Sequence, residues 1–553
     1  MGDKIKKIFG IDLGTTYSSI AHVDEFGKAV VIPNADNQRV TPSVVFFDGG
    51  NIVVGEVAKE SAKLYPDDVV SFVKRSMGEA DFLFEYDSKS YRAEEISSYI
   101  LRKLVQDAEQ AIGEKISDVV ITCPAYFGIN EREATKNAGE IAGFNVRQII
   151  NEPTAAAIAY GSEGLSDNYV VLVFDLGGGT FDVTMIDIHS DSIEVICTGG
   201  DHNLGGKDWD DRIVAFLVQE FQKQTESDED ILEDPDTCQD LQLVAERSKK
   251  ILSQRLKTPV SITHGGKRVK IELKREKFEE ITQDLLERTV TLTQGLLDEA
   301  KKKNYDKFDE FILVGGSVRM PHIAERIRQE FSIEPKIFDP DEAVAKGAAI
   351  FAWKLALNDG MIKRIAEKTN KSIDEINNIV DLPSEQVEAA ARELAEETGY
   401  TLPAVQSSMV EIKDVASKSF GVVVHNSEDE EIVFNLILRN TVVPVNTQKK
   451  FFTAVAGQKT VLIRIMESET GDKKIPLDQS VEIGTAILNL PPNLRADTPV
   501  MIYFELNKEG RLQMTAIESS ESRKVDVNIA TYSVIQGKQL EEAKERSQSL
   551  VVY

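Results

Sequence analysis

Hydrophobic and polar positions divide the chain into three kinds of region. From residue 8 to about residue 357, short apolar runs that end at glycine or aspartate alternate with segments of helical spacing, such as 94–112. Residues 358–410 read as a small helical segment, and from 419 to 531 apolar residues recur at every second position in several stretches. The pattern predicts an α/β region, then a helical insertion, then an antiparallel β region.

Two glycine-rich turns follow apolar strands in the α/β region. In Val173–Val183 the strand reaches Asp175, turns through Gly177, Gly178 and Gly179, and resumes as an alternating apolar strand. Glycines let backbone N–H groups approach an anion closely, and aspartate and threonine oxygens are ligands that Mg²⁺ accepts. Taken alone, such a turn is a simple tight hairpin about as often as a phosphate loop.

A second copy of this turn lies near the start of the chain, in Ile8–Thr16. The repetition predicts a duplicated fold in which two phosphate-binding loops face one nucleotide. A third glycine turn, Gly315-Gly316-Ser317, follows the apolar run Phe311–Val314. A strand that breaks into glycines at the start of a helix is typical of the nucleotide-binding edge of an α/β sheet.

Composition excludes several other classes of protein. The chain has 553 residues, 42% of them hydrophobic and 28% charged, which is typical of a multidomain globular protein. Its net charge of −28 argues against a nucleic-acid-binding surface, and no apolar run reaches membrane-spanning length. Cys123, Cys197 and Cys238 lack metal-binding spacing and are expected to be reduced thiols. We therefore expect a cytoplasmic protein with neither membrane nor nucleic acid as a partner.

The order of motifs along the chain resembles one family. The motifs are Asp12-Leu13-Gly14-Thr15-Thr16, Lys74, Asn151–Ala157, Asp175–Thr180, Gly205-Gly206 and Leu313–Ser317. In this order they resemble the 70-kDa heat-shock chaperones of the DnaK type, within the actin-like ATPase superfamily. The resemblance implies an α/β actin-like ATPase domain of two duplicated lobes, followed here by a small helical insertion and an antiparallel β-sandwich.

The resemblance and the pattern together give the expected domain boundaries. They are the actin-like nucleotide-binding domain over 1–357, the helical insertion over 358–410, an interdomain linker over 411–419, the peptide-binding β-sandwich over 420–535, and a short C-terminal helix without a lid over 536–553. The insertion has no counterpart that we recognise in the family.

The resemblance also implies the catalytic groups and the cofactors, ATP or ADP with Mg²⁺. Lys74 matches the family's catalytic lysine, and Glu152 would help to orient the attacking water. Asp12 and Asp175 would hold Mg²⁺, mostly through water, and Thr180 belongs to the second phosphate loop. Phosphoryl transfer depends mainly on positioning and electrostatics, which these residue types supply.

Further residues match the family's nucleotide contacts. The phosphate-binding residues are Gly14, Thr15, Thr16, Tyr17, Gly177, Gly178, Gly179, Gly205 and Gly206, and the adenosine-binding residues are Glu246, Lys249, Lys250, Ser253, Gly315, Gly316, Ser317, Arg319 and Asp341. Family members usually have an arginine in place of Lys250. Because lysine stacks less well on adenine, we expect somewhat weaker nucleotide binding.

The β-sandwich carries the expected peptide site. In the family, an extended apolar peptide lies in a channel of the sandwich and is held by main-chain hydrogen bonds and one central pocket. By alignment, the pocket residues are Val422, Phe451, Val461 and Ile463, and the arch over the peptide is His425 with Ala454. For any one of these residues, a purely structural place in the sandwich core is about equally expected.

Three features depart from the family. The leucine run that docks the family's linker is absent after Lys413-Asp414-Val415, where Ala416-Ser417-Lys418-Ser419 follows. The arginine that family members offer to J-domain co-chaperones is replaced by Gln148. A helical lid is missing apart from a short stretch at 536–548, so bound peptide should dissociate quickly.

Two hypotheses of different class follow, with a third that is disfavoured. The first is an ATP-hydrolysing, lidless chaperone that binds exposed apolar segments of unfolded polypeptides, with J-domain co-chaperones and nucleotide-exchange factors as implied partners. The second is a nucleotide-controlled scaffold or sensor that binds one specific protein. A sugar or acetate kinase of actin-like fold is disfavoured, because the β domain would have no role and Lys74 with Glu152 fits hydrolysis by water.

Overall fold

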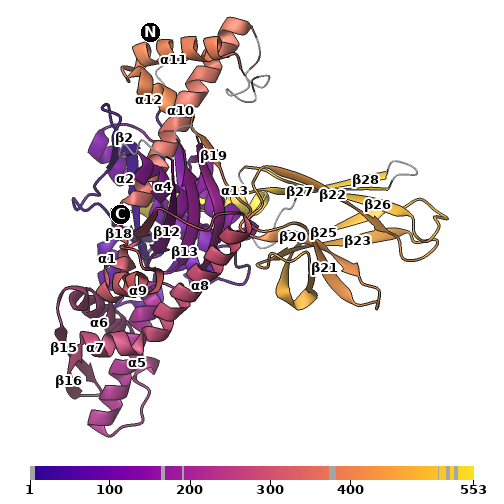
Figure 1. The fold of residues 1–553 in the computed structure, drawn as a ribbon. Coiled ribbons are helices and arrows are strands. Elements are labelled where there is room, and N and C mark those ends of the chain that lie inside the picture. The colour runs from indigo at the N-terminus through magenta and orange to yellow at the C-terminus, as the bar shows by residue number, and fades with distance from the viewer. Residues whose placement is uncertain are drawn as a thin grey trace.

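The computed structural model describes residues 6–162, 168–189, 192–370, 372, 376, 382–508, 510–518, 523–528 and 534–553. These residues form an α/β domain of two lobes, a helical extension at one end of it, and a β-sandwich that projects from its side (Figure 1). None of the described helices is long and apolar enough to cross a membrane.

Lobe I is built on a sheet in the order β11-β10-β1-β2-β3. Its strands are β1 (Phe9–Asp12), β2 (Tyr17–Val23), β3 (Ala29–Val31), β10 (Asp118–Cys123) and β11 (Asn145–Asn151). β1 and β2 form an antiparallel hairpin, whereas β10 runs parallel to β1 and β11 runs parallel to β10. Every residue of β10 is buried, as expected for a central parallel strand covered on both faces.

Lobe II repeats this arrangement with the sheet order β18-β17-β12-β13-β14-β19. Its strands are β12 (Tyr169–Leu176), β13 (Phe181–Ile188), β14 (Ser192–Asp201), β17 (Glu310–Val314), β18 (Lys336–Ile337) and β19 (Glu411–Lys413). Here β12 and β13 form the antiparallel hairpin, and β17 runs parallel to β12. The same hairpin-plus-parallel-strand plan in both lobes confirms the predicted duplication.

Helices pack against both sheets and form the outer parts of the lobes. Lobe I contains α1 (Glu56–Ser61), α2 (Ala93–Ile112), α3 (Ile129–Ile141) and a small sheet with β5 (Val44–Asp48), β6 (Asn51–Val54) and β7 (Val69–Ser71). Lobe II contains α5 (Gly206–Thr225), α6 (Pro235–Gln254), the hairpin β15 (Lys257–His264) and β16 (Lys267–Lys274), α7 (Arg275–Ile281), α8 (Gln283–Lys302) and α9 (Pro321–Phe331).

Two helices join the lobes. α4 (Glu152–Gly161) and α10 (Ala343–Thr369) pack on each other, and their small residues share one buried cluster with strands of both lobes. A Cβ added to Gly347 of α10 would lie 1.7 Å from the carbonyl oxygen of Ala155 in α4. Glycine is therefore required where these helices cross.

The domain boundary expected at residue 357 is wrong, because α10, which spans it, continues to Thr369. Leu357, Met361 and Ile365 extend its buried side and pack against α11 (Ser384–Thr398) and α12 (Leu402–Ser407). The boundary drawn between 357 and 358 thus falls inside a continuous helix. The helical extension has its own apolar core, and α12 leads directly into β19.

The β-sandwich consists of two antiparallel sheets, in the orders β24-β21-β20-β23-β25 and β22-β26-β27-β28. Its strands are β20 (Ser419–His425), β21 (Glu431–Ile437), β22 (Val445–Phe452), β23 (Thr460–Ser468), β24 (Lys474–Pro476), β25 (Ser480–Asn489), β26 (Pro499–Leu506), β27 (Leu512–Glu518) and β28 (Arg523–Asn528). Alternate residues of both sheets, such as Phe420, Ile465 and Phe504, point inward and form the core.

The expected linker residues are ordered rather than extended between domains. Glu411–Lys413 form β19, which pairs in parallel with β14 of lobe II through Ile193 and Ile412. Ile412 packs against the buried cluster that joins the lobes, and Ser419 already belongs to β20. The linker therefore adds a strand to the lobe II sheet, although the family's leucine run is absent.

The C-terminal residues lie on lobe I rather than on the sandwich. α13 (Lys538–Ser549) packs on α2 and α3, and β29 (Val551–Val552) pairs in parallel with β6. The expectation of a single short helix was incomplete, because a two-residue strand follows it. Val534 and Ile535, which we expected to belong to the sandwich, also pack against lobe I clusters.

Candidate nucleotide site and peptide-binding domain

The two repeated hairpin turns meet between the lobes. A Cβ added to Gly178 would lie 1.7 Å from Thr16 Oγ1, and a Cβ on Gly179 would lie 2.3 Å from Thr15 Cγ2. No side chain fits between the turns, so their backbones line one narrow space. Thr15 Oγ1 is buried there without a hydrogen-bond partner among the described residues, which is a group that a phosphate oxygen could satisfy.

Residues of α5 and the third glycine turn support the second hairpin from behind. The Gly206 N–H donates to the Gly177 carbonyl at 3.0 Å, and Ser317 Oγ donates to the same oxygen at 2.7 Å. A Cβ on Gly205 would lie 2.5 Å from Gly179 N. Gly315 has a φ of 86°, which favours glycine. These contacts show that two further motifs, Gly205-Gly206 and Gly315-Gly316-Ser317, meet at the second hairpin.

A buried charge cluster lies beside the hairpins. Lys74 Nζ is 2.5 Å from Glu152 Oε1, and both side chains are less than one-tenth exposed. Asp12, Asp175 and Asp182 surround this pair. Burial, together with the charge of Glu152, raises the pKa of Asp12 and of Asp182 to about 7 and raises that of Asp175 well above its usual value.

This cluster has more negative than positive groups, and a divalent cation would relieve the imbalance. Four carboxylates face one ammonium, and Lys74 keeps its proton because Glu152 and Asp12 outweigh the effect of burial and raise its pKa. Among the described residues, no three His, Cys, Asp or Glu side chains are placed to hold a bare metal ion together. The residues therefore fit a hydrated Mg²⁺ held partly by bound phosphates.

A second ionic network closes the space at the expected adenosine side. Glu246 of α6 accepts hydrogen bonds from Lys59 of α1 and from Tyr17 and Lys250. Burial acts to raise the pKa of Glu246, but Lys59 and Lys250 outweigh it and lower the pKa to about 2. Lys250 Nζ also lies 5.0 Å from the Tyr17 ring centroid. Lys250 thus ties lobe II to lobe I instead of lying free to stack on a base.

The remaining residues that were predicted to contact adenosine lie around the same space. Lys249 turns away from it, because its Nζ donates to the Gly206 carbonyl and pairs with Asp210 at 2.7 Å. Ser253 Oγ donates to the Lys249 carbonyl. Arg319 and Asp341 form a half-exposed ion pair next to Gly316. Arg319, Asp341 and Gly316 thus form one group, whereas Lys249 supports the loop behind it.

The structure adds residues that the sequence analysis did not select. Asp182 is buried beside Glu152, and its carboxylate accepts the Tyr126 N–H at 3.1 Å. Arg75 donates to the Gly179 carbonyl and pairs with Asp208 at 2.5 Å, joining the lobes next to the second hairpin. Asp182 lies in the strand that directly follows the second hairpin turn, and Arg75 follows Lys74, so a position next to a motif was an available signal.

The predicted peptide-site residues divide into two groups. Val422 and Ile463 are buried in the sandwich core, and Phe451 and Val461 are partly buried against the same cluster. His425 ends β20 in an exposed position, and Ala454 lies exposed in the loop after β22. The first four residues therefore come together, while the arch of His425 over Ala454 remains a prediction.

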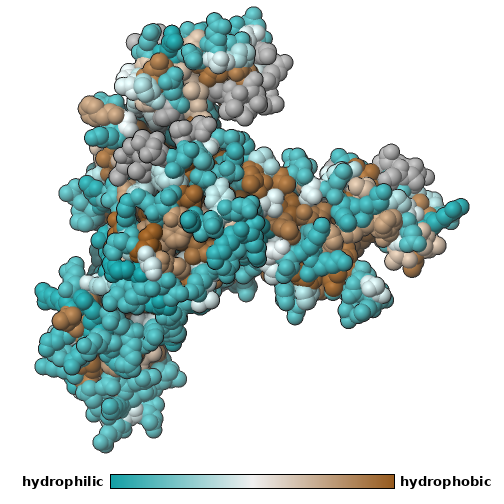
Figure 2. All heavy atoms as spheres, viewed as in Figure 1, coloured by the Kyte–Doolittle hydropathy of each residue, from teal (hydrophilic) through white to brown (hydrophobic). Residues whose placement is uncertain are grey.

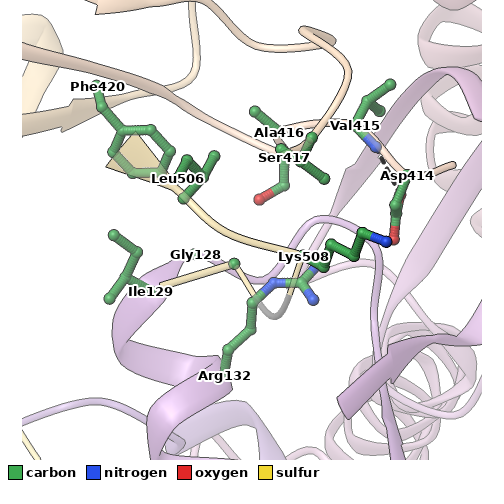
Figure 3. A pocket seen from close by; sticks show the side chains of 12 residues that line it. Gly128, Ile129, Arg132, Asp414, Val415, Ala416, Ser417, Phe420, Leu506 and Lys508 are labelled. Carbon is green, nitrogen blue, oxygen red and sulfur yellow. Dashed lines mark hydrogen bonds between the residues drawn. The ribbon is translucent and has the colours of Figure 1, made fainter. Parts of the chain in front are cut away.

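The sandwich docks on the α/β domain through polar contacts around Asp414. Asn151, the residue before Glu152, donates to Asp414 at 2.7 Å, and Arg132 donates to Asn151. A cavity of about 20 Å³ lies here between Arg132 of α3, Asp414 and Lys508, enough for about one water molecule (Figure 3). Burial raises the pKa of Asp414. The linker is thus connected to the residue next to Glu152.

Further along the linker, a lysine lies where the family has the leucines that dock on the ATPase domain. Lys418 is buried, pairs at 3.1 Å with Glu469, the residue after β23, and lies 3.4 Å from the ring centroid of Tyr126 in lobe I. Glu467 accepts the Ile129 N–H of α3 at 3.2 Å. Lys418 therefore contacts lobe I through a cation–π contact where the family buries leucines, and Glu467 adds a hydrogen bond from α3.

Comparisons with known proteins agree with this geometry. The model of a family described as Hsp70 protein matches residues 8–84, 79–362 and 382–551. The chain is 38% identical over 524 residues to a chaperone protein DnaK of Thermosipho melanesiensis, covering 93% of this chain and 79% of the relative. It is also 38% identical over 525 residues to a chaperone protein DnaK of Thermotoga neapolitana, with the same coverage of both chains. Similarity of this extent shows that the chain belongs to the Hsp70 family.

Proposed function

We propose that this chain is an ATP-dependent molecular chaperone that hydrolyses ATP between its lobes and binds exposed apolar segments of unfolded proteins in its sandwich. The meeting of the two hairpins over the Lys74–Glu152 pair carries the nucleotide part of the proposal. The relatives described above are named as chaperones, which supports the second part and gives the scaffold hypothesis no support.

In the proposed site, the hairpin backbones and Thr15 bind the phosphates of ATP. Mg²⁺ would be held by Asp12 and Asp175, mostly through its waters, and would neutralise phosphate charge. Lys74 places its ammonium where negative charge develops on the transferred phosphate, and Glu152 holds that ammonium in place. Asp182, beside Glu152, is a further group within this cluster that can hold a proton near neutral pH.

The peptide part of the proposal rests on the exposed apolar surface of the sandwich. Phe452 and Val455, which lie within two residues of the expected arch residue Ala454, are 61% and 60% exposed. Figure 2 shows brown, hydrophobic surface on the sandwich and at its junction with the α/β domain, whereas the far end of lobe II is mostly hydrophilic. An exposed apolar loop beside a partly buried pocket suits an extended apolar peptide.

The dissociation rate of a fluorescent apolar peptide tests the proposal, measured first with ADP and then with ATP. Because Asn151 links Asp414 of the linker to Glu152, we expect ATP to speed peptide release at least tenfold. Peptide that binds with equal dissociation rates in both nucleotides would mean that the two domains are uncoupled. Failure of several unrelated apolar peptides to bind would exclude the chaperone function.

Replacing Gly178 by alanine should weaken nucleotide binding at least tenfold. The new Cβ would lie 1.7 Å from Thr16 Oγ1 and 2.7 Å from Thr16 Cβ, so rotation of the hydroxyl alone cannot relieve the clash and the hairpins must separate. Calorimetric titration with ADP measures the change. Gly295→Ala is the control, because nothing lies within 4 Å of the Cβ added on α8. Equal affinities in the two variants would show that the hairpins do not clamp the nucleotide.

The proposal includes binding of co-chaperones by this chain. J-domain proteins and nucleotide-exchange factors are the partners that the family implies, and Gln148 lies on β11 where the family offers an arginine to the J domain. Arg147, one residue earlier, pairs instead with Asp359 of α10 at 2.7 Å. We therefore propose that any J-domain contact of this chain relies on residues other than position 148.

A further inference from the structure

We propose that Ser18 and Ser43 are positioning residues for the hairpin between β1 and β2, because together they hold both the N–H and the carbonyl of Gly14. Ser18 lies in β2, and Ser43 follows β4 (Thr41–Pro42), the short strand that pairs with the start of β2. The inference rests on the proposed function, since it gives these two hydroxyls a role in binding the phosphates of ATP.

Three hydrogen bonds join the two serines and Gly14 into a closed ring. The Gly14 N–H donates to Ser18 Oγ at 3.1 Å, and Ser43 Oγ donates to the Gly14 carbonyl at 2.7 Å. The two hydroxyl oxygens lie 2.8 Å apart. Because the carbonyl can only accept, it uses the single hydroxyl proton of Ser43, and Ser18 therefore donates to Ser43. Each hydroxyl donates once and accepts once, so the ring has a single direction.

Both serines are shielded from water, so solvent cannot replace either hydroxyl. Ser18 and Ser43 are 1% and 2% exposed. Removing one hydroxyl would leave a buried polar group without its partner, which costs more than the loss of an exposed hydrogen bond. The Ser43 N–H also donates to the Thr16 carbonyl at 2.8 Å. Gly14 and Thr16, the residues on either side of Thr15, are thus both held by Ser43.

Peptide geometry connects this ring to a phosphate-binding group. The Gly14 carbonyl and the Thr15 N–H belong to one planar trans peptide, so they point in opposite directions. By fixing the carbonyl, Ser43 therefore fixes the direction of the Thr15 N–H, which has no acceptor among the described residues. The Thr15 hydroxyl is also buried without a partner in that part of the chain. Thr15 thus presents two unused donors, which suit an anion.

The second hairpin carries the same bond at the equivalent atom. Gly177 takes the place of Gly14 in the repeated motif, and Ser317 Oγ donates to its carbonyl at 2.7 Å, as Ser43 does to Gly14. The N–H of that peptide belongs to Gly178. Ser43 lies between β4 and β5, whereas Ser317 lies in the turn after β17. A bond that recurs at one atom from unrelated segments points to a requirement that the two hairpins share.

Binding of ADP and of adenosine to the full chain tests this role. We expect Ser43→Ala and Ser18→Ala each to weaken ADP binding at least tenfold. Adenosine binding should stay within twofold, because adenosine lacks the phosphates that the hairpin would hold. Calorimetric titration measures both ligands. Ser408→Ala is the control, because Ser408 of the helical extension is 3% exposed and its hydroxyl donates to the Val405 carbonyl at 2.6 Å. It loses a comparable buried bond and should bind ADP like the unaltered protein.

Combining the two substitutions tests the ring as a unit. Ser18→Ala with Ser43→Ala should weaken ADP binding by no more than about threefold beyond the weaker-binding single variant, because either change alone already opens the ring. Single losses that multiply in the double variant would overturn the ring. Turnover gives a second readout. The KM for ATP should rise with the Kd for ADP, while kcat stays within threefold, since Lys74 pairs with Glu152 rather than with the ring.

Two further results would overturn the inference and leave the proposed function intact. One is ADP binding by both single variants that equals that of the unaltered protein. The other is a loss of adenosine binding as large as the loss of ADP binding, which would show a general disturbance of lobe I. Failure of the unaltered protein to bind ADP would instead overturn the proposed function, and this inference with it. If Ser43→Ala does not fold, Ser18→Ala decides the question alone.

Discussion

Replacing Lys74 by alanine is expected to slow ATP hydrolysis at least a hundredfold while leaving nucleotide binding largely intact. In the described structure Lys74 pairs with Glu152, and its positive charge also acts on the buried carboxylates of Asp12 and Asp175. Loss of one preorganised charge that stabilises the transition state costs about 3 kcal/mol. The hairpin backbones, which we propose bind the phosphates, keep their geometry because Lys74 does not touch them.

Removing Lys74 also takes away the ion-pair partner of Glu152, whose other charged neighbours are carboxylates. We therefore expect nucleotide binding by the variant to depend more steeply on Mg²⁺ concentration, because a cation must then offset four carboxylates alone. Steady-state phosphate release measures turnover, and titration with ADP at several Mg²⁺ concentrations measures binding. Full turnover in Lys74→Ala would remove this lysine from the mechanism.

A matched control separates loss of charge at the site from loss of any buried ion pair. Lys103 of α2 pairs with the buried Asp107 at 2.9 Å, away from both hairpins. Lys103→Ala removes a comparable pair and should leave hydrolysis within twofold of the unaltered protein. If both variants lose turnover equally, general destabilisation explains the effect, and thermal unfolding of the two proteins would show it.

Local sequence signals predicted the parts of the fold that glycine and aspartate define. The two hairpins and the turn at Gly315 were found because their conformations and close contacts admit no larger residue. Their convergence was inferred from the repetition of the turn and from the resemblance, because no local signal joins residues such as Thr16 and Gly178, which are far apart in the chain. Asp182 was missed because the alternation of Phe181, Asp182 and Val183 places it like an ordinary polar residue on the outward side of a strand, whereas it is buried.

The parts that could not be predicted depend on distant contacts. β29 has two residues, too short for any periodic signal, and its partner β6 lies near the other end of the chain. The linker was expected to lack the family's docking element, yet Ile412 supplies the apolar contact of β19 and Lys418 supplies a cation–π contact with Tyr126 of lobe I. The resemblance and the hydrophobic pattern set the boundary at 357, whereas helical spacing through Ile365 continues the helix beyond it.

Replacing Val461 by phenylalanine is expected to weaken binding of an apolar peptide at least tenfold and to leave basal ATP hydrolysis unchanged. Val461 lies on β23 opposite Leu488 and packs, partly buried, against the sandwich core that includes Val422 and Ile463. A phenylalanine ring would fill the space that we propose for the central side chain of the peptide. Overpacking of this kind costs about 1–3 kcal/mol of stability, so thermal unfolding must accompany the binding measurement.

Leu462→Phe is the matched control for this substitution. Leu462 is the next residue of the same strand, points outward and is 60% exposed, so the added ring meets solvent instead of the core. Fluorescence anisotropy with one labelled peptide compares the two variants. Loss of affinity in Val461→Phe alone would support a pocket on the inner side of β23. Unchanged affinity in a folded Val461→Phe protein would place the peptide elsewhere on the sandwich, with the exposed loop at Phe452 and Val455 as the next surface to test.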